Sequence, residues 1–376
     1  MSEKNQNWPE WLPLREELRH RTPYGAPQVE ADARLNTNEN PYALPEQVAK
    51  SIAQSISTHL AELNRYPDRD ALELRDALAK YVNTYLRPDG QVTRANIWPA
   101  NGSNEVLQTI LLAFDGPVAG FSPSYSMHPL LTMGAGKKFE TIPLKSDFSI
   151  EMDNSLSVVD SLKPSIFFLT TPNNPTGKSI TLDEIERIVV AVSKHGGITI
   201  VDEAYGEFSS LPSALQLLDS LPSLIIVRTM SKAFAFAGAR IGYAIAREEV
   251  ISALQLVRLP YHLSSISQLS GVAALSHAST LLQEVEQIKS ERDRLSQELK
   301  ALGFQVVMSD ANFILFGGIH QIAAISGWSS EELWRELLDR GVLIRDVGIK
   351  GFLRVTVGLP NENLRFITAL REITAK

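Results

Sequence analysis

Short apolar runs alternate with helical patterns between about residue 96 and residue 246, and this alternation constrains the fold more than any other feature of the sequence. Each run ends at a cluster of polar residues, after which helical periodicity resumes. The runs lie at 97–98, 118–121, 166–169, 198–201, 224–227 and 243–246. Such alternation is typical of α/β domains, whose parallel strands are joined by right-handed helical crossovers. We therefore predict a large domain with a mostly parallel sheet flanked by helices.

The segments around this region complete a two-domain prediction. Helices are expected over 45–63 and 70–86, and a long helical stretch with a break is expected over 265–302. Shorter strands and helices follow, which indicates a smaller α+β domain. We expect an N-terminal arm at 1–35 that packs with the small domain, a large domain at 36–275 and a small domain at 276–376.

Composition excludes several classes of function. The net charge of the 376-residue chain is −7, which argues against non-specific binding to nucleic acid. The absence of cysteine excludes disulfides and thiolate nucleophiles, and the seven histidines lack the spacing of a metal site. No apolar run approaches the roughly 20 residues of a membrane span, and the first residues carry no signal-peptide core. We expect a cytoplasmic protein without a metal.

Lys232 follows the apolar run 224–227, a place where lysine is costly to bury without a partner. Desolvation makes an amine a better nucleophile, so one function for this lysine is to form an imine with an aldehyde cofactor. A solvated loop lysine is the ordinary alternative. Thr229 and Ser231 supply hydroxyls nearby, and Arg240 supplies a guanidinium suited to a phosphate.

Other predicted strand ends also carry polar residues, and the carboxyl ends of parallel strands meet at one edge of a sheet. Gly102, Ser103 and Asn104 open a helix whose N-terminus suits an anion, although Ser103 is equally compatible with an ordinary N-cap. Asp202 emerges from an apolar run and needs a partner. A protonated pyridine nitrogen would serve, with Tyr205 close by, and helix capping is the alternative.

Two further residues fit the same ligand. Tyr125 could stack on a planar ring or simply pack in its loop, and Asn174 lies in a turn that its prolines and glycine would explain by themselves. Each feature alone is weak, but their order along the chain is informative. A phosphorylated pyridine aldehyde accounts for all of them together.

Several motifs resemble those of the fold type I pyridoxal-phosphate aminotransferases, and the resemblance covers essentially the whole chain. They are Asn-Asn-Pro-Thr-Gly at 173–177, Asp-Glu-Ala-Tyr at 202–205, Ser-Lys-Ala-Phe at 231–234, Gly-Ala-Arg-Ile-Gly at 238–242 and Leu-Arg-Val-Thr-Val-Gly at 353–358. Within that class, the segments 35–41, 64–68, 231–238 and 343–346 are most similar to the histidinol-phosphate aminotransferases. The aromatic amino-acid aminotransferases are a near relative.

The resemblance implies a role for each candidate residue. Lys232 would form the imine and move a proton between the substrate's α-carbon and the cofactor, and Asp202 would pair with the ring nitrogen. Asn174 and Tyr205 would hold the ring hydroxyl, with Tyr125 stacked on the ring. The remaining cofactor-binding residues would be Gly102, Ser103, Asn104, Thr229, Ser231 and Arg240, with Tyr66 from the partner subunit. The substrate-binding residues would be Arg354, Arg345, Tyr24 and Asn38. Asn104 stands where many relatives carry an acidic residue, but backbone N–H groups supply the phosphate contacts there.

The resemblance also implies a homodimer with shared active sites and pyridoxal 5'-phosphate as the cofactor. The substrates would be histidinol phosphate with 2-oxoglutarate, or imidazole acetol phosphate with glutamate, in histidine biosynthesis. An aromatic amino-acid (phenylalanine) aminotransferase is the alternative. Other pyridoxal-phosphate chemistries share this fold, because fold does not fix function. A non-enzymatic regulator is the remaining rival, and it would need an added DNA-binding module.

Overall fold

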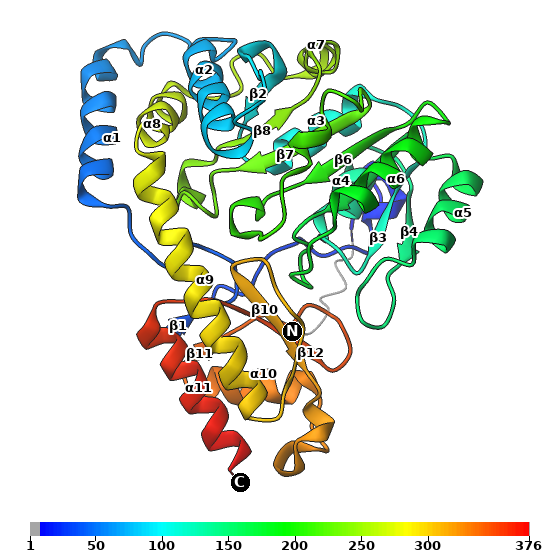
Figure 1. Ribbon diagram of the computed structural model, residues 1–376, viewed down its shortest axis with the longest axis vertical. Coiled ribbons are helices and arrows are strands. Elements are labelled where there is room, and N and C mark those ends of the chain that lie inside the picture. Colours follow the sequence, from blue (N-terminus) through cyan, green and yellow to red (C-terminus); the bar gives the residue numbers. More distant parts are fainter. Residues whose placement is uncertain (1–7, 376) are drawn as a thin grey trace.

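The computed structural model describes residues 8–375, and its main feature is a seven-stranded sheet (Figure 1). In order across the sheet the strands are β2 (Ile97–Ala100), β8 (Gly242–Ile245), β7 (Leu224–Thr229), β6 (Ile198–Asp202), β5 (Ile166–Thr170), β3 (Val118–Ser122) and β4 (Phe139–Pro143). Strand β8 runs antiparallel to both of its neighbours, and the other six strands share one direction. The predicted mostly parallel sheet is confirmed.

Both faces of this sheet are apolar, because successive strand residues point to opposite sides and helices cover both sides. In β5, Ile166 and Phe168 belong to one hydrophobic core, whereas Phe167 and Leu169 belong to the other. The first face is covered by α3 (Ser103–Ala113), α4 (Met127–Gly134) and α7 (Glu248–Val257). The second face is covered by α2 (Leu72–Tyr81), α5 (Met152–Leu162), α6 (Leu182–Ser193) and α8 (Ser265–Leu275).

Local signals explain where some of these elements begin and end. The hydroxyl of Thr181 accepts a hydrogen bond from the Glu184 amide, and the Glu184 carboxylate accepts one from the Thr181 amide, which is the predicted capping box of α6. The helix expected over 70–86 is α-helical only to Tyr81 and continues as a π-helix to Leu86. The sequence does not predict β4, because it is an edge strand that pairs on one side only and alternates poorly.

A second, smaller sheet occupies the lower half of Figure 1. Its strands are antiparallel, in the order β12 (Phe352–Thr356), β10 (Phe313–Gly317) and β9 (Gln305–Val306). Nearby, β1 (Ala33–Arg34) pairs in parallel with β11 (Val342–Leu343). Three helices, α9 (Ala278–Ala301), α10 (Ser330–Asp339) and α11 (Pro360–Thr374), pack around this sheet, and the core between them includes Leu295, Phe316 and Phe366.

Helix α9 joins the two sheets. The expected long helical stretch is broken at Ser276 and His277, where α8 ends and α9 begins. Leu281 of α9 lies in the core of the large sheet, whereas Leu295 and Leu299 lie in the core of the small sheet. The yellow helix in Figure 1 therefore spans both parts of the molecule.

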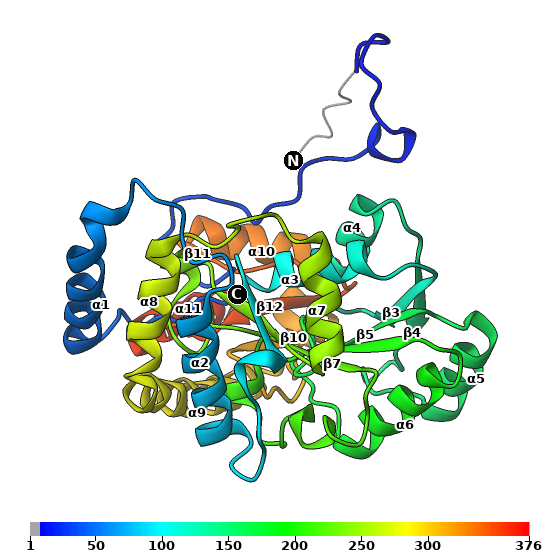
Figure 2. The ribbon, with the colours of Figure 1, turned by 90° about the horizontal axis from the view of Figure 1, so that it is seen from above.

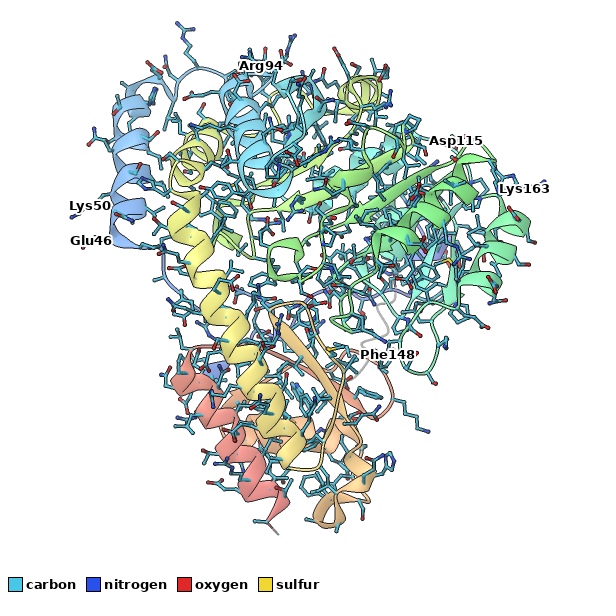
Figure 3. All side chains as sticks on the ribbon, viewed as in Figure 1. Glu46, Lys50, Arg94, Asp115, Phe148 and Lys163 are labelled. Atoms are coloured by element: carbon cyan, nitrogen blue, oxygen red, sulfur yellow. The ribbon has the colours of Figure 1, made fainter. Side chains whose placement is uncertain are left out.

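Helix α1 (Glu46–His59) packs on α8 at one edge of the molecule. Figure 3 shows Glu46 and Lys50 on its outer side, where they form an ion pair at 2.5 Å. The N-terminal stretch from residue 8 to residue 32, dark blue in Figure 2, projects from the body of the molecule. Arg15 in this stretch still contacts the body, since it donates a hydrogen bond to the Met133 carbonyl of α4 at 3.0 Å. Residues 1–7 of the predicted arm lie outside the described residues. Within 8–375, no helix combines the length and the apolar character needed to cross a membrane.

Candidate active site

A cavity of about 610 Å³ opens at the carboxyl ends of the parallel strands, between the large sheet and the small one. Strands β5, β6 and β7 all end at its wall, and helix α3 begins there. Fourteen of the residues predicted as site residues line this cavity. They are Tyr24, Asn38, Ser103, Asn104, Tyr125, Asn174, Asp202, Tyr205, Thr229, Ser231, Lys232, Arg240, Arg345 and Arg354.

Lys232 lies in the loop that follows β7, with its amine inside the cavity. The amine donates a hydrogen bond to the Thr37 carbonyl oxygen at 3.2 Å and lies 6.0 Å from the centre of the Tyr205 ring. Removal from water lowers the pKa of Lys232 to about 8, and the positive charge of Arg354 adds to this effect. A useful fraction of the amine is therefore neutral and nucleophilic near neutral pH.

Asp202 is buried at the end of β6 and faces a histidine that the sequence prediction missed. His128 Nε2 lies 3.4 Å from Asp202 Oδ2, and the other carboxylate oxygen accepts a hydrogen bond from the Ala204 amide at 3.1 Å. The His128 ring stacks on Phe168 with 4.4 Å between ring centres, and its edge meets Tyr125. The only sequence signal was the spacing, since His128 follows Tyr125 by three residues, or about one helical turn.

The hydroxyl of Tyr205 accepts hydrogen bonds from two asparagine side chains, Asn38 at 2.9 Å and Asn174 at 3.4 Å. The Asn174 amide oxygen in turn accepts a hydrogen bond from Arg354 Nη1 at 2.6 Å. Arg354 Nη2 donates to the Asn36 carbonyl at 2.8 Å. One network therefore connects the turn after β5, the end of β6, the segment before α1 and strand β12.

Arg354 projects from the small sheet into the cavity as a buried cation. Burial lowers its pKa to about 10, and its Nε has no hydrogen-bond partner. The hydrogen bonds of its guanidinium go to two uncharged oxygens, the Asn174 amide oxygen and the Asn36 carbonyl, whereas buried charges are normally paired. The backbones of Arg345 and Arg354 bond to each other at 2.9 Å, which brings both arginines to the same wall. This wall suits an anionic ligand.

A second anion-binding corner forms where α3 begins. Gly102 has a φ of +80°, and a Cβ atom there would lie 2.5 Å from Arg240 Nη2. Arg240 Nη1 donates to the Ser231 hydroxyl at 3.4 Å, and the Thr229 hydroxyl donates to Ser231 Oγ at 2.9 Å. The free N–H groups of the first helical turn, two hydroxyls and a guanidinium thus converge, as a phosphate requires. Gly102 itself contributes by its close approach to Arg240, although it does not line the cavity.

Tyr66 lies outside this cavity. Its side chain is 79 % exposed, and its ring stacks on Tyr261 with 4.5 Å between ring centres. Tyr261 is also exposed, as is Leu259, which precedes it by two residues in the chain. Tyr66 therefore does not reach the cavity of its own chain, and the contact predicted for it requires a second subunit.

The sequence model described as "Aminotransferase class I and II" matches residues 32–370 of the chain. The chain belongs to this family of aminotransferases. A curated relative from Corynebacterium efficiens, named histidinol-phosphate aminotransferase, is 50% identical over 367 residues, which cover 96% of this aminotransferase and 95% of the relative. The fold prediction, a fold type I transferase, is confirmed by solved structures.

Two solved histidinol-phosphate aminotransferases share the fold of this aminotransferase. The structure from Clostridium acetobutylicum has a TM-score of 0.80 at 24% identity and covers 91% of this chain and 99% of that one. The structure from Sinorhizobium meliloti, in complex with pyridoxal-5'-phosphate, has a TM-score of 0.76 at 25% identity and covers 92% of each chain.

The residues of this aminotransferase fit a phosphorylated pyridine aldehyde. The buried carboxylate of Asp202 and the buried phenol of Tyr205 stand at the ends of one short segment, and the depressed pKa of Lys232 suits imine formation. The anion-binding corner at Gly102 and Arg240 would accept a phosphate but leaves no room there for a side chain. These features come from separate strands and one helix, and they converge on a single cavity.

Proposed function

We propose that the chain is a pyridoxal-phosphate-dependent histidinol-phosphate aminotransferase. It would exchange an amino group between histidinol phosphate or imidazole acetol phosphate and 2-oxoglutarate or glutamate, as a step of histidine biosynthesis. The observation that carries this proposal is a single cavity lined by a partly neutral lysine, by Arg240 beside the start of α3 and by Arg345 and Arg354 of the small sheet. The names of the relatives and the family membership support the same reaction.

In this proposal the cofactor is held at three points. Asp202 would pair with the ring nitrogen, and His128 Nε2 lies 3.4 Å from Oδ2 of this carboxylate. Asn174 and Tyr205 would bind the ring hydroxyl, and Tyr125 would pack on the ring face. The phosphate would be held at the corner made by Gly102, Ser103, Asn104, Thr229, Ser231 and Arg240. When bound, the cofactor acts as an electron sink for the carbanion that the reaction creates.

The protein's own contribution to the chemistry centres on Lys232. Its Nζ would accept the proton from the substrate carbon that carries the amino group and deliver it to the cofactor, not back to the same carbon. A pKa of about 8 suits this exchange, because a general base works best when its pKa is near the operating pH. The Thr37 carbonyl oxygen, which accepts a hydrogen bond from Nζ at 3.2 Å, fixes the direction of the amine.

The two-arginine wall explains how one cavity would serve two substrates. Glutamate carries a side-chain carboxylate and histidinol phosphate carries a phosphate, and a guanidinium can bind either anion with two hydrogen bonds. Arg354 would bind that group, helped by Arg345, Tyr24 and Asn38. Tyr24 already lies over the cavity, since its hydroxyl oxygen accepts a hydrogen bond from Ser126 at 3.2 Å.

The proposal includes a homodimer in which Tyr66 reaches the cofactor phosphate of the partner subunit. Tyr66 and Tyr261 form an exposed stacked pair, and Leu259, two residues before Tyr261, is 70 % exposed. Large exposed apolar surfaces mark interfaces. The N-terminal stretch that extends from the body in Figure 2 would add to the contact. We also propose the division into an arm at 1–35, a large domain at 36–275 and a small domain at 276–376, and a cytoplasmic location.

The test compares kcat/KM for histidinol phosphate and for phenylalanine, each with 2-oxoglutarate as acceptor. We expect a strong preference for histidinol phosphate, because its phosphate can pair with Arg354. A preference for phenylalanine would refute the substrate assignment and leave the reaction class standing. Glutamate alone should convert the bound cofactor to its amine form and release 2-oxoglutarate. Absence of this half-reaction would refute the aminotransferase proposal.

A further inference from the structure

A cluster of buried charges lies on the opposite face of the large sheet from Asp202 and takes no part in the cavity lining. It consists of Arg228 on β7, Glu203 directly after β6, and Glu207 in the 3₁₀ turn Gly206–Phe208. The side chains of these three residues are at most 3 % exposed. We call them the Arg228 cluster.

The guanidinium of Arg228 joins the two carboxylates. Its Nη1 forms an ion pair with Glu203, and its Nη2 lies 3.0 Å from Glu207 Oε1. Glu203 also accepts hydrogen bonds from the Ser213 hydroxyl at 2.6 Å and from the Ala214 amide at 2.7 Å. The Tyr81 hydroxyl donates to Glu207 at 3.1 Å. The cluster is therefore tied to neighbouring elements on several sides.

Stability alone does not account for such a cluster. A buried ion pair can often be replaced by packed apolar residues with no loss of stability, whereas removal of one partner is strongly destabilising. Burial acts to lower the pKa of Arg228, but Glu207 and Glu203 outweigh it and raise that pKa above its ordinary value. The guanidinium thus stays charged and keeps both carboxylates in place. Such a cluster holds the segments that carry its residues in a fixed position relative to one another.

The geometry it fixes belongs to the cavity. In the parallel register Asp202 pairs with Val227, which places Glu203 beside Arg228 on the face of the sheet opposite to Asp202. Glu207, which carries the second carboxylate, follows Tyr205 by two residues. Gly206 lies between these two residues, and a Cβ atom on it would lie 2.6 Å from Arg228 Nη2. The guanidinium therefore packs directly on the backbone of Gly206.

We propose that Arg228 is a positioning residue for the reaction, acting through Glu203 and Glu207. By holding both ends of the segment 203–207 against β7, it sets where Asp202 and Tyr205 stand in the cavity. The proposal rests on the proposed function, because those two residues act on the cofactor. Loss of the guanidinium would leave two like charges buried side by side, and the segment would shift to separate them.

The test uses Arg228→Lys and Arg228→Met, with Arg75→Met as the matched control. Arg75 is also a buried arginine, 8 % exposed, but it donates to the Arg94 carbonyl, away from the cavity. Three experiments are made: amide hydrogen exchange of 203–208 in cofactor-free protein, a pH titration of the colour of bound pyridoxal phosphate, and kinetics of the glutamate half-reaction, which give kcat and KM. Arg228→Lys keeps a charge and so provides a folded variant if Arg228→Met does not fold.

For Arg228→Lys we expect faster exchange within 203–208 and a shifted colour-change pH. A misplacement of about 1 Å in the cavity would lower kcat by about 100-fold while KM for glutamate changes little. Arg75→Met should lower Tm but leave the exchange pattern of 203–208, the colour change and kcat as in the wild type.

The proposal is overturned if Arg228→Lys keeps the wild-type colour-change pH and kcat, or if Arg75→Met alters them equally. A result that refutes the proposed function can be distinguished from these outcomes, because the wild type itself would then not transfer an amino group from histidinol phosphate. A wild type that took up no pyridoxal phosphate would also refute the proposed function, and the exchange comparison would still decide whether Arg228 fixes the segment.

Discussion

Replacing Gly242 by alanine should separate the two structural elements that form the anion-binding corner. A Cβ atom at this position would lie 2.2 Å from the Ser103 amide nitrogen and 2.4 Å from the Gly102 carbonyl carbon. Both contacts are with backbone, which cannot rotate away as a side chain can. The start of β8 and the N-terminus of α3 would therefore have to move apart by about 1 Å to reach ordinary van der Waals separation.

The size of the effect follows from the hydrogen bonds that this movement would lengthen. A hydrogen bond to a charged group contributes roughly 1.5–3 kcal/mol, so loss of one phosphate contact should weaken pyridoxal-phosphate binding by about 10- to 100-fold. Overpacking should also lower the free energy of unfolding by about 1–3 kcal/mol. Gly238 lies four residues earlier, in the 3₁₀ turn Ala237–Ala239, with nothing within 4 Å of an added Cβ, so Gly238→Ala is the matched control.

The assay is absorbance titration of cofactor-free protein with pyridoxal phosphate and, in parallel, with pyridoxal, which lacks the phosphate. Gly242→Ala should lose affinity for pyridoxal phosphate and keep most of its affinity for pyridoxal, and Gly238→Ala should match the wild type for both. Equal losses for both ligands would show that the substitution damages the cavity as a whole. Unchanged affinity for pyridoxal phosphate would refute the assignment of this corner to the phosphate.

Four shorter predictions test other parts of the site. Acylation of Lys232 in cofactor-free protein should rise as the pH passes about 8, because the neutral amine accumulates above its lowered pKa; a rise confined to the ordinary lysine range would contradict this. Arg354→Met should raise KM for glutamate by about 10- to 100-fold, and an unchanged KM would place the substrate anion elsewhere. Asp202→Asn should bind pyridoxal phosphate yet lose most turnover at saturating cofactor, which steady-state kinetics would check. Tyr66→Phe should weaken cofactor binding by about 10-fold although Tyr66 lies outside its own cavity; wild-type affinity would exclude a contact from the partner subunit.

The sequence predicted those parts of the fold whose signals are local. Buried strands such as β5 and β7 are continuous apolar runs, and α6 carries its capping box in Thr181 and Glu184. Strand β4 escaped prediction because an edge strand that is open on one side need not be apolar. The break between α8 and α9 was expected, but its position at Ser276 and His277 depends on packing against both cores rather than on a proline or glycine.

The sequence predicted those cavity residues that directly follow an apolar strand. It did not predict residues that reach the cavity only through tertiary packing. The positions of Lys232 and Asp202 follow from the runs before them. His128 lies on a helix, and only the packing of α4 on the sheet brings it to 3.4 Å from Asp202. Asn36 enters through its backbone carbonyl, a contact that no side-chain pattern reveals. The Arg228 cluster was missed because a lone arginine in an apolar strand gives no sign of its partners.

The position of Arg354 would connect binding of an anion to the arrangement of the two sheets. Its guanidinium belongs to the small sheet, yet its two hydrogen bonds go to Asn174 beside the large sheet and to Asn36 in the segment between β1 and α1. If the substrate anion binds Arg354 as proposed, it would compete with Asn174 and Asn36 for the same N–H groups. Binding of the anion would then weaken the hydrogen bonds that join the two parts of the molecule, so that binding and relative movement of the sheets would be thermodynamically linked. An uncharged molecule of the same shape could not replace those hydrogen bonds. Only anionic ligands would therefore favour relative movement of the two sheets.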